Sequence, residues 1–301
     1  MKSRVEPQGL HYYCRESGTH ILLDEIITKP SAYSIAPRTV SIAITDECDF
    51  RCSYCYVNLK DRNLPKEDII SYCKQLDLYG SFDIAFGGGE PTLHPDLVEI
   101  CQTLWRETEL GISITTHGHN LNEELISKLK NFVSFIRVSI DGIEPIYSML
   151  RSKPLQNLLP TLELLKGNIP FGINTVVNKL TVKKLDDLKL LFFQYGAFEL
   201  LLLPMWHKGK FVLSNDEWLL LNEWVEKNYK EVPIRISSES RKYLKLPFLF
   251  DSEEWDNDYA FIGIDKTFRK NSFTKEGLQI ANYDSFETLL KDWKQSLLKS
   301  D

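Results

Sequence analysis

Short apolar runs alternate with segments of helical periodicity between residues 40 and 230. The runs are rich in β-branched and aromatic residues, as in VSIAIT and FGINTVV, which is typical of buried strands. The segments between them repeat apolar residues every three or four positions, which is typical of helices that bury one face. We predict strands at 40–45, 83–86, 111–116, 135–140, 171–177 and 199–203, and helices at 66–78, 96–106, 122–129, 155–165, 184–193 and 215–229.

Strands that alternate with helices form a parallel sheet with the helices packed outside it. Six such units are fewer than the eight of a closed barrel, so we predict an α/β fold, a partial (β/α)6 TIM-like barrel. The flanking segments differ: LHYYC-RESGT-HILLDEI predicts an N-terminal β-hairpin, and the last seventy residues or so predict a small α+β C-terminal extension. The expected division is a hairpin extension at 1–37, a barrel core at 38–230 and a C-terminal extension at 231–301.

Composition and charge narrow the class of protein. Hydrophobic residues make up 43% of the 301 residues, enough to bury a sizeable core. A net charge of −6 gives no overall basic field, so a nucleic-acid partner is not expected. No apolar run is long enough to span a membrane. Three of the six cysteines crowd between residues 48 and 55, unlike a secreted disulfide framework, and we expect a cytoplasmic protein that uses thiolates locally.

Cys48, Cys52 and Cys55 have C-x3-C-x2-C spacing directly after the first strand. Three thiols this close can point at one centre only from a compact loop, and three thiolates leave one iron of a four-iron cluster without a protein ligand. A zinc site is one alternative, but it needs a fourth ligand, and the next histidine is the distant His94. A disulfide with a spare thiol is another. The spacing favours an iron–sulfur cluster.

Three glycines, Gly87 to Gly89, follow the second strand and precede Glu90 and Pro91. Consecutive glycines let the backbone approach a ligand closely. A phosphate-binding loop would continue with a lysine and a serine or threonine, and none follows. A plain glycine turn remains the alternative. Because loops after parallel strands gather at one edge of the sheet, we expect the cysteines and the glycines there together.

The segment TDECDFRCSYCY resembles the signature loop of the radical S-adenosylmethionine (radical SAM) superfamily, and GGEP within FGGGEP resembles a second motif of that family. The resemblance implies that the cysteine triad holds one [4Fe-4S] cluster, whose unique iron chelates S-adenosyl-L-methionine. It implies that Tyr54 lies against the adenine of this cofactor. It also implies that the glycine motif holds the methionyl ammonium, through Gly87, Gly88, Gly89 and Glu90.

Later strand ends resemble further elements of the same family. Thr116 lies where related enzymes carry a TNG triplet near the ribose, with His117 in place of the asparagine. Ser139, in an SxDG element, is implied to contact the cofactor carboxylate or ribose, and Arg151 to pair with that carboxylate, which suits a guanidinium. Asn174 is implied to line the ribose or adenine. The alternatives are a locally bonded loop histidine, a surface arginine and a strand-end cap.

The resemblance implies reductive cleavage of S-adenosylmethionine to a 5′-deoxyadenosyl radical, which abstracts hydrogen from a substrate; no residue is assigned as catalytic. The N-terminal hairpin and a cysteine-free tail with SPASM- or twitch-like rhythm resemble peptide-modifying RiPP maturases, so we expect a ribosomally made peptide substrate and one cluster only. The alternatives are a small-molecule or nucleotide substrate and a non-catalytic iron–sulfur or zinc interaction module. A flavodoxin or ferredoxin is the expected electron donor.

The remaining cysteines are expected to be structural. Cys73 and Cys101 lie on apolar helix stripes and are predicted core residues, whereas Cys14 in the hairpin has a second interpretation as a hydrogen-atom donor at the barrel mouth. Residues after the sixth strand either face substrate or cap the barrel: Trp206, His207 and Lys208. Basic residues of the C-terminal extension are predicted to be solvated: Arg241, Lys242, Lys266, Arg269 and Lys270.

Overall fold

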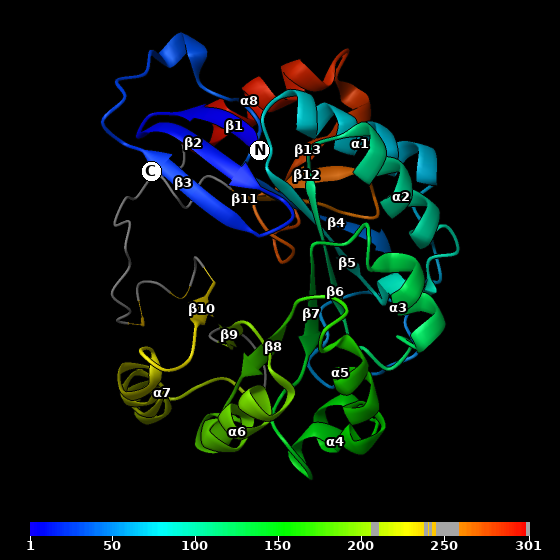
Figure 1. Cartoon of the computed structure of the whole chain (residues 1–301), viewed down its shortest axis with the longest axis vertical. Helices are drawn as coiled ribbons and strands as arrows, with labels where there is room; N and C mark the ends of the chain where they lie inside the picture. Colours follow the sequence, from blue (N-terminus) through cyan, green and yellow to red (C-terminus); the bar gives the residue numbers. More distant parts are fainter. Residues whose placement is uncertain (206–210, 238–239, 241–242, 245–258, 299–301) are drawn as a thin grey trace.

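The fold is built around one large sheet flanked by helices (Figure 1). The computed structural model describes residues 1–205, 211–237, 240, 243–244 and 259–298. Neighbouring strands run parallel from β4 to β10, which confirms the partial TIM-like barrel. These strands are β4 (Thr39–Thr45), β5 (Asp83–Gly88), β6 (Gly111–Thr116), β7 (Phe135–Ser139), β8 (Phe171–Val177), β9 (Leu200–Pro204) and β10 (Ile234–Ile236).

Helices follow the strands and cover the outside of the sheet. They are α1 (Lys66–Leu78), α2 (Leu97–Glu107), α3 (Glu123–Leu129), α4 (Ile146–Arg151), α5 (Leu159–Leu165), α6 (Leu185–Tyr195) and α7 (Asn215–Asn228). The bounds of α1, β6 and β8 are those predicted. The helix predicted at 155–165 is a 3-10 turn, Leu155–Asn157, followed by α5, and α4 was not predicted.

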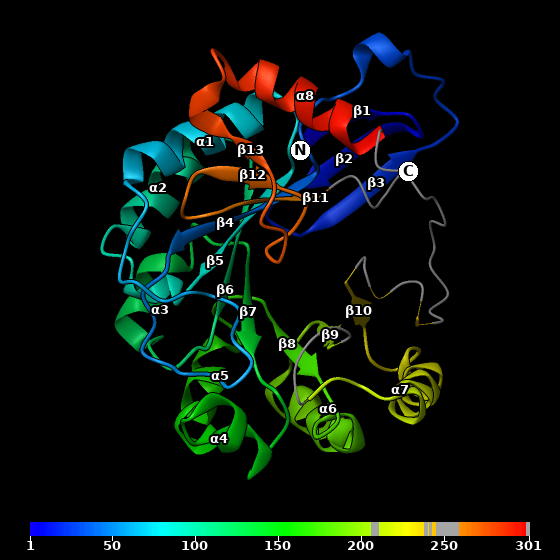
Figure 2. The same ribbon diagram turned by 180° about the vertical axis from the view of Figure 1, so that it is seen from behind.

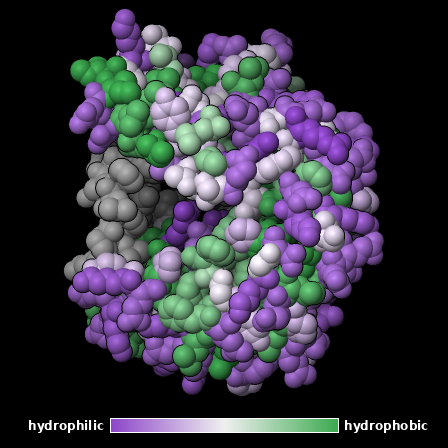
Figure 3. Space-filling view, viewed as in Figure 1, coloured by the Kyte–Doolittle hydropathy of each residue, from purple (hydrophilic) through white to green (hydrophobic). Residues whose placement is uncertain are grey.

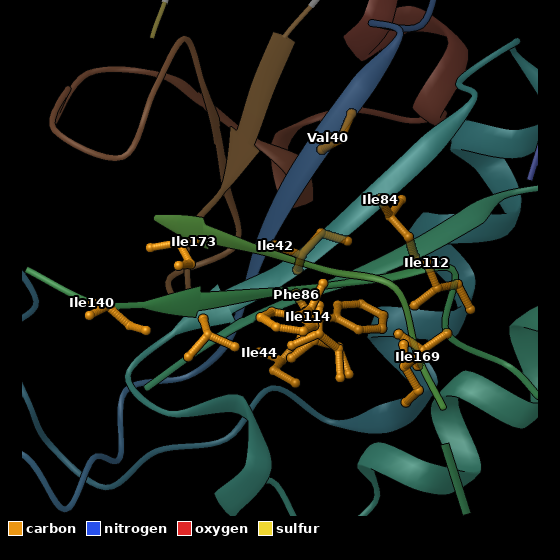
Figure 4. Close-up of a cluster of buried hydrophobic side chains, with 14 of the residues drawn as sticks. Val40, Ile42, Ile44, Ile84, Phe86, Ile112, Ile114, Ile140, Ile169 and Ile173 are labelled. Carbon is orange, nitrogen blue, oxygen red and sulfur yellow. The ribbon is translucent and has the colours of Figure 1, made fainter. Parts of the chain in front are cut away.

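Alternate strand positions build the core between sheet and helices. Val40, Ile42 and Ile44 of β4 meet Ile84 and Phe86 of β5 in one apolar cluster (Figure 4). This cluster also contains two completely buried thiols, which confirms the prediction that Cys73 and Cys101 are core residues.

The intervening strand positions face the barrel interior, because side chains alternate across a strand. Several of these positions are polar: Thr39 donates to Asp83 Oδ2 at 3.1 Å, and Arg137 Nη2 lies 2.6 Å from Glu199 Oε1. The space-filling view shows hydrophilic surface inside a hollow on this side of the molecule (Figure 3).

The N-terminal residues form a small antiparallel sheet of β1 (Lys2–Glu6), β2 (Gly9–Cys14) and β3 (Thr19–Leu23). The β2–β3 pair confirms the predicted hairpin, and β1 is an additional strand. This sheet covers the amino ends of the barrel strands, where Lys2 Nζ donates to Asp77 O at 2.9 Å. Arg15 donates to Thr108 O in the loop before β6, so its neighbour Cys14 lies at the amino edge and not at the mouth.

The C-terminal segment extends the other side of the barrel sheet. β11 (Tyr259–Ile262) runs parallel to β4, and β12 (Thr267–Arg269) and β13 (Leu278–Gln279) continue as an antiparallel meander. β10, which lies within the same predicted extension, instead pairs with β9 at the opposite edge. The segment predicted as an extension thus contributes strands to both edges.

The last helix, α8 (Phe286–Leu298), packs beside α1 in both views (Figure 2). Tyr79 Oη donates to Glu287 at 3.4 Å, and the rings of Tyr72 and Phe286 stack at 6.1 Å. Within the described ranges, no helix combines the length and apolar character that crossing a membrane requires.

Two of the described basic residues of the C-terminal segment are solvated as predicted: Lys270 is exposed, and Lys266 is 44% exposed and pairs with Asp68. The prediction is wrong for Arg269, whose side chain is 14% exposed and pairs with Asp265. The remaining residues singled out in the sequence lie outside the described residues: Trp206, His207, Lys208, Arg241 and Lys242.

Candidate cofactor site

The loop after β4 carries three thiols at the carboxyl edge of the sheet. Cys48 and Cys52 are half-buried, Cys55 is exposed, and none forms a disulfide. Burial raises the pKa of the Cys48 thiol to about 11, and burial also raises the pKa of Cys52. A thiolate at these positions is therefore costly unless a cation binds it, since coordination by a metal deprotonates a thiol. This donor set fits a metal cluster.

Two histidines near the loop have no free ring nitrogen to complete a zinc site. His94 Nε2 donates to Leu64 O at 2.9 Å, and its Nδ1 accepts from Asp96 N at 3.1 Å. His117 Nδ1 accepts from His119 N at 3.1 Å, so Nε2 carries the proton that it donates to Asp49 Oδ1 at 2.8 Å. Among the described residues, the ligand atoms that lie within 4.8 Å of one another are those of Cys48, Asp49 and His117. Asp49 and His117 already bond each other, and no fourth zinc ligand is preformed beside them in the described part of the chain.

The side chain of His117 has a structural role that the sequence did not reveal. Its ring stacks on Phe50, in the middle of the cysteine loop, with centroids 3.9 Å apart and planes 10° apart. Its Nε2 lies 3.3 Å from Glu90 Oε2 as well as bonding Asp49. The available signal was the exchange of asparagine for histidine in the TNG-like triplet, together with an aspartate and an aromatic directly after Cys48.

The three glycines after β5 have different surroundings. A Cβ on Gly88, whose φ is +113°, would lie 2.2 Å from Thr45 O, and a Cβ on Gly89 would lie 2.1 Å from Glu47 O. A Cβ on Gly87 would meet nothing within 4 Å. Gly88 and Gly89 therefore let the glycine motif pack against the start of the cysteine loop, while Gly87 leaves open space beside the backbone.

Glu90 is almost fully buried and ties two strand ends together. Its Oε1 accepts from Thr92 N, Thr92 Oγ1 and Thr116 Oγ1 at 3.1, 2.6 and 2.6 Å. Its Oε2 accepts from His117 N at 2.9 Å. The resemblance implied that Glu90 holds the methionyl ammonium. Here four protein donors already use most of the acceptor capacity of the carboxylate.

Arg151, on α4, is buried against Asp141 and is not a surface arginine. Its Nε lies 2.7 Å from Asp141 Oδ2, the oxygen to which Tyr54 Oη also donates, and Asp141 Oδ1 accepts from Val176 N at 2.8 Å. Burial opposes the charge, but Asp141 keeps the pKa of Arg151 above its ordinary value. Burial raises the pKa of Tyr54, so its hydroxyl stays protonated and can donate.

Asn174 and Ser139 are neighbours on β8 and β7 at the same edge. The Asn174 side chain is 8% exposed, and its Oδ1 has no hydrogen-bond partner among the described residues. A buried acceptor without a donor costs free energy, which a ligand donor would recover. Asn174 is therefore not a strand-end cap. The thiols, the space at Gly87 and this oxygen together fit a cluster with a polar cofactor.

Comparison with known proteins places the barrel core in a family. Residues 42–191 match the radical SAM superfamily. An uncharacterized protein of Methanocaldococcus jannaschii is 32% identical over 52% of this chain and 58% of its own length. The S-adenosylmethionine-dependent nucleotide dehydratase of Flammeovirga pacifica is 27% identical (51% and 58%), and the GTP 3',8-cyclase of Aquifex aeolicus 30% (51% and 51%). The chain spans about half the length of these relatives.

Solved structures share the fold over a longer stretch. Streptococcus suis SuiB bound to precursor peptide SuiA superposes with a TM-score of 0.76 at 14% identity, over 97% of this chain and 86% of that chain. The enzyme anSMEcpe, with bound AdoMet and the Cp18Cys peptide, gives a TM-score of 0.63 at 18% identity, over 85% and 82%. With the cysteine loop inside the matched core, the chain belongs to the radical SAM superfamily, enzymes that use a [4Fe-4S] cluster and S-adenosylmethionine.

Proposed function

We propose that this protein is a radical SAM enzyme that holds one [4Fe-4S] cluster on Cys48, Cys52 and Cys55 and binds S-adenosylmethionine beside it. When bound, the cluster and cofactor supply the 5′-deoxyadenosyl radical that removes hydrogen from a substrate. The observation that carries the proposal is that three unbridged thiols and a buried oxygen lie at one sheet edge; this oxygen, Asn174 Oδ1, has no donor among the described residues. A one-electron donor such as flavodoxin or ferredoxin is the partner this chemistry needs.

The protein residues would bind and orient the cofactor. Asn174 offers an acceptor, the backbone at Gly87 offers room, and Ser139 lies beside Asn174 on the neighbouring strand. The other cofactor-site residues would fix the strand ends. Tyr54 and Arg151 both bond Asp141, and Thr116 bonds Glu90. Gly88 and Gly89 allow close packing against the cysteine loop.

Anaerobic reconstitution tests the proposed chemistry. With iron, sulfide, dithionite and S-adenosylmethionine, the protein should bind four irons per chain and release 5′-deoxyadenosine slowly even without substrate. Purified protein that carries zinc, or thiols that cannot be loaded with iron, would contradict the proposal. Eight irons per chain would contradict the single cluster.

We propose further that the substrate is a ribosomally made peptide. The likeness to SuiB supports this, since it extends over the segments outside the matched core, at 1–37 and 231–301, and SuiB is described with a bound precursor peptide. The anSMEcpe structure likewise contains a peptide. In this proposal the core at 38–230 performs the cofactor chemistry and the two extensions adapt it to a peptide.

A nucleotide substrate is the second candidate, because two of the sequence relatives are named as acting on nucleotides. Their similarity is confined to about half of the chain.

The measurement that discriminates between the two substrates is 5′-deoxyadenosine release with a peptide encoded beside the gene or with GTP. A several-fold stimulation and a mass change in the peptide are expected. Stimulation by GTP alone would favour the second candidate. The cytoplasmic location stays a prediction.

A further inference from the structure

We propose that His117 is a positioning residue that fastens the cysteine loop to the glycine motif before either cofactor binds. This inference rests on the proposed function, since it assigns His117 a part in building that cofactor site. Nothing in the TNG-like resemblance assigns a role to the histidine. The role follows from the partners of its ring nitrogens, its ring face and its backbone.

Each part of His117 contacts a different element of the site. Its backbone N–H donates to Glu90 Oε2 at 2.9 Å, which ties it to the end of β5. Its Nε2 donates to Asp49 Oδ1 at 2.8 Å, next to Cys48. Its ring covers Phe50 at 3.9 Å, between Cys48 and Cys52. One residue at the end of β6 thus connects the loop and the motif, which otherwise meet through backbone contacts.

The orientation of the ring is fixed from the other side. His119 N donates to His117 Nδ1 at 3.1 Å, so Nδ1 must be the acceptor and Nε2 the donor. His119 Nε2 lies 2.9 Å from Tyr147 Oη, and the His119 ring lies edge-on to Phe50 at 4.9 Å. The His117 side chain is 4% exposed, so neither water nor a rotamer change can easily replace these contacts.

This arrangement matters because other hydrogen bonds at the middle of the cysteine loop hold residues 51–53, from Ser53 N to Leu150 O at 3.0 Å and from Ser152 Oγ to Arg51 O at 3.1 Å. The bond from His117 holds Asp49, which precedes them. The Asp49 side chain is 39% exposed, and Cys55 is exposed at the end of the triad. Ordering such a loop costs conformational entropy. If His117 orders Asp49 and Phe50 in advance, cluster binding need not bear that cost, and the loop holds its metal for longer.

Two conservative variants separate the bonds of His117. Glutamine places an N–H group near the position of Nε2 and can keep the bond to Asp49, whereas asparagine places an oxygen near Nδ1 and can keep only the bond from His119. Both variants lose the ring that stacks on Phe50, so the difference between them reports the bond to Asp49. We expect His117→Gln to hold the reconstituted cluster longer than His117→Asn. We expect His117→Asn and Asp49→Ala to lose it to a chelator about ten-fold faster than the native protein does.

The readout is the anaerobic bleaching rate of the cluster with excess chelator, together with the electron paramagnetic resonance spectrum before and after addition of S-adenosylmethionine. The spectral change on cofactor addition should persist in the Gln variant and weaken in the Asn variant. Thermal melting of the metal-free proteins shows whether either variant is simply unfolded. The double variant Asp49→Ala, His117→Asn should bleach faster by less than the product of the two single effects, because both changes remove the bond between Asp49 and His117.

Equal bleaching by the Gln, Asn and native proteins would overturn the inference, as would an Asn variant that outlasts the Gln variant. The second result would mean that only the turn at His119 matters. These measurements need a bound cluster but no turnover. A native protein that binds iron and releases no 5′-deoxyadenosine would refute the proposed function and still leave the comparison of variants readable.

Discussion

The two edges of the barrel both bury charged groups, but they do so differently. At the amino edge, Glu6 lies among Arg4, His11 and Arg38, with its oxygens 2.7 to 3.1 Å from their nitrogens. At the carboxyl edge, Glu90 and Asp141 are also satisfied by protein donors. The carboxyl edge also holds Cys48 and Cys52, whose thiol pKa values are raised by burial, and the exposed Cys55. The buried Asn174 Oδ1 lies there as well, and it has no donor among the described residues.

The difference separates stability from binding. The Glu6 cluster joins the N-terminal sheet to the barrel, since Arg38 directly precedes β4, and it serves the fold. At the carboxyl edge, the hydrogen bonds of Glu90 and Asp141 are satisfied by protein donors, and these residues form a scaffold. The three thiols and Asn174 Oδ1 form a second set of groups, which a bound ligand would satisfy. Variants of the Glu6 cluster and of the satisfied scaffold should therefore change unfolding, whereas variants of the unsatisfied groups at the carboxyl edge should change metal or cofactor binding.

The largest effect is expected at the thiols. Cys52→Ser removes one of three cluster ligands, so iron content and 5′-deoxyadenosine release should both fall to background. The metal-free variant should melt at the same temperature as the metal-free native protein, because Cys52 is only half-buried. Cys101→Ser is a matched control, since this thiol is buried in the core and should affect stability without affecting iron. Iron retained at four per chain in Cys52→Ser would remove this contrast between the edges.

A large effect on stability is expected at Arg151, although this residue lies at the carboxyl edge. Arg151→Met leaves the completely buried Asp141 carboxylate without its cation, which should cost about 3–5 kcal/mol of unfolding free energy. The scaffold at the carboxyl edge would then resemble the amino edge in its importance for stability. Urea denaturation of the metal-free proteins measures this cost. Lys153→Met, an exposed cation on the same segment, should leave the midpoint unchanged.

Glu6 is expected to contribute a pH-dependent stability that has no counterpart in cofactor binding. Burial opposes ionisation, but the hydrogen bond from His11 and the charges of Arg4 and Arg38 lower the pKa of Glu6 to about 2. The folded pKa is depressed, so the stabilisation is present above the ordinary pKa of 4.5 and is lost as pH falls toward 2. The difference corresponds to roughly 3 kcal/mol at neutral pH.

Glu6→Gln tests this assignment. The unfolding free energies of variant and native protein should differ at pH 7 and converge between pH 4.5 and 2, as the native carboxylate takes up its proton. Affinity for S-adenosylmethionine, measured at pH 7 on the folded fraction, should be unchanged. A constant difference across this pH range would show that Glu6 acts through packing and not through its charge.

Sequence patterns predicted the helices and strands whose buried positions are apolar. They missed a strand whose buried positions are charged. β8 was predicted to the residue because FGINTVV is a β-branched run. β1 was missed because its buried positions are Lys2, Arg4 and Glu6, which indicate a solvated segment when their partners are unknown. α4 has six residues, too few to show a helical period. The pairing of β10 and β11 with opposite edges depends on contacts that periodicity does not encode.

The same division holds within the site. The cysteines and glycines could be located because each carries its chemistry in local spacing. The bonds from His117 to Asp49 and from Tyr54 to Asp141 join residues 68 and 87 positions apart, so no local pattern indicates them. The family resemblance implied one role for the three glycines, whereas the structure separates Gly87 from the other two.

The smallest expected effect follows from this difference between Gly87 and the other two glycines, and it concerns affinity for S-adenosylmethionine. Gly87→Ala places a methyl group in open space, so folding and iron loading should be unchanged, while affinity for S-adenosylmethionine should fall several-fold if the cofactor uses that space. Gly89→Ala is the contrasting variant, since its methyl group would collide with Glu47 O and displace the cysteine loop, which lowers iron loading itself. Equilibrium binding of the cofactor to both iron-loaded proteins decides the matter. An unchanged affinity in Gly87→Ala would mean that this open space lies outside the cofactor site, because a ligand packed against the backbone would tolerate no added carbon there.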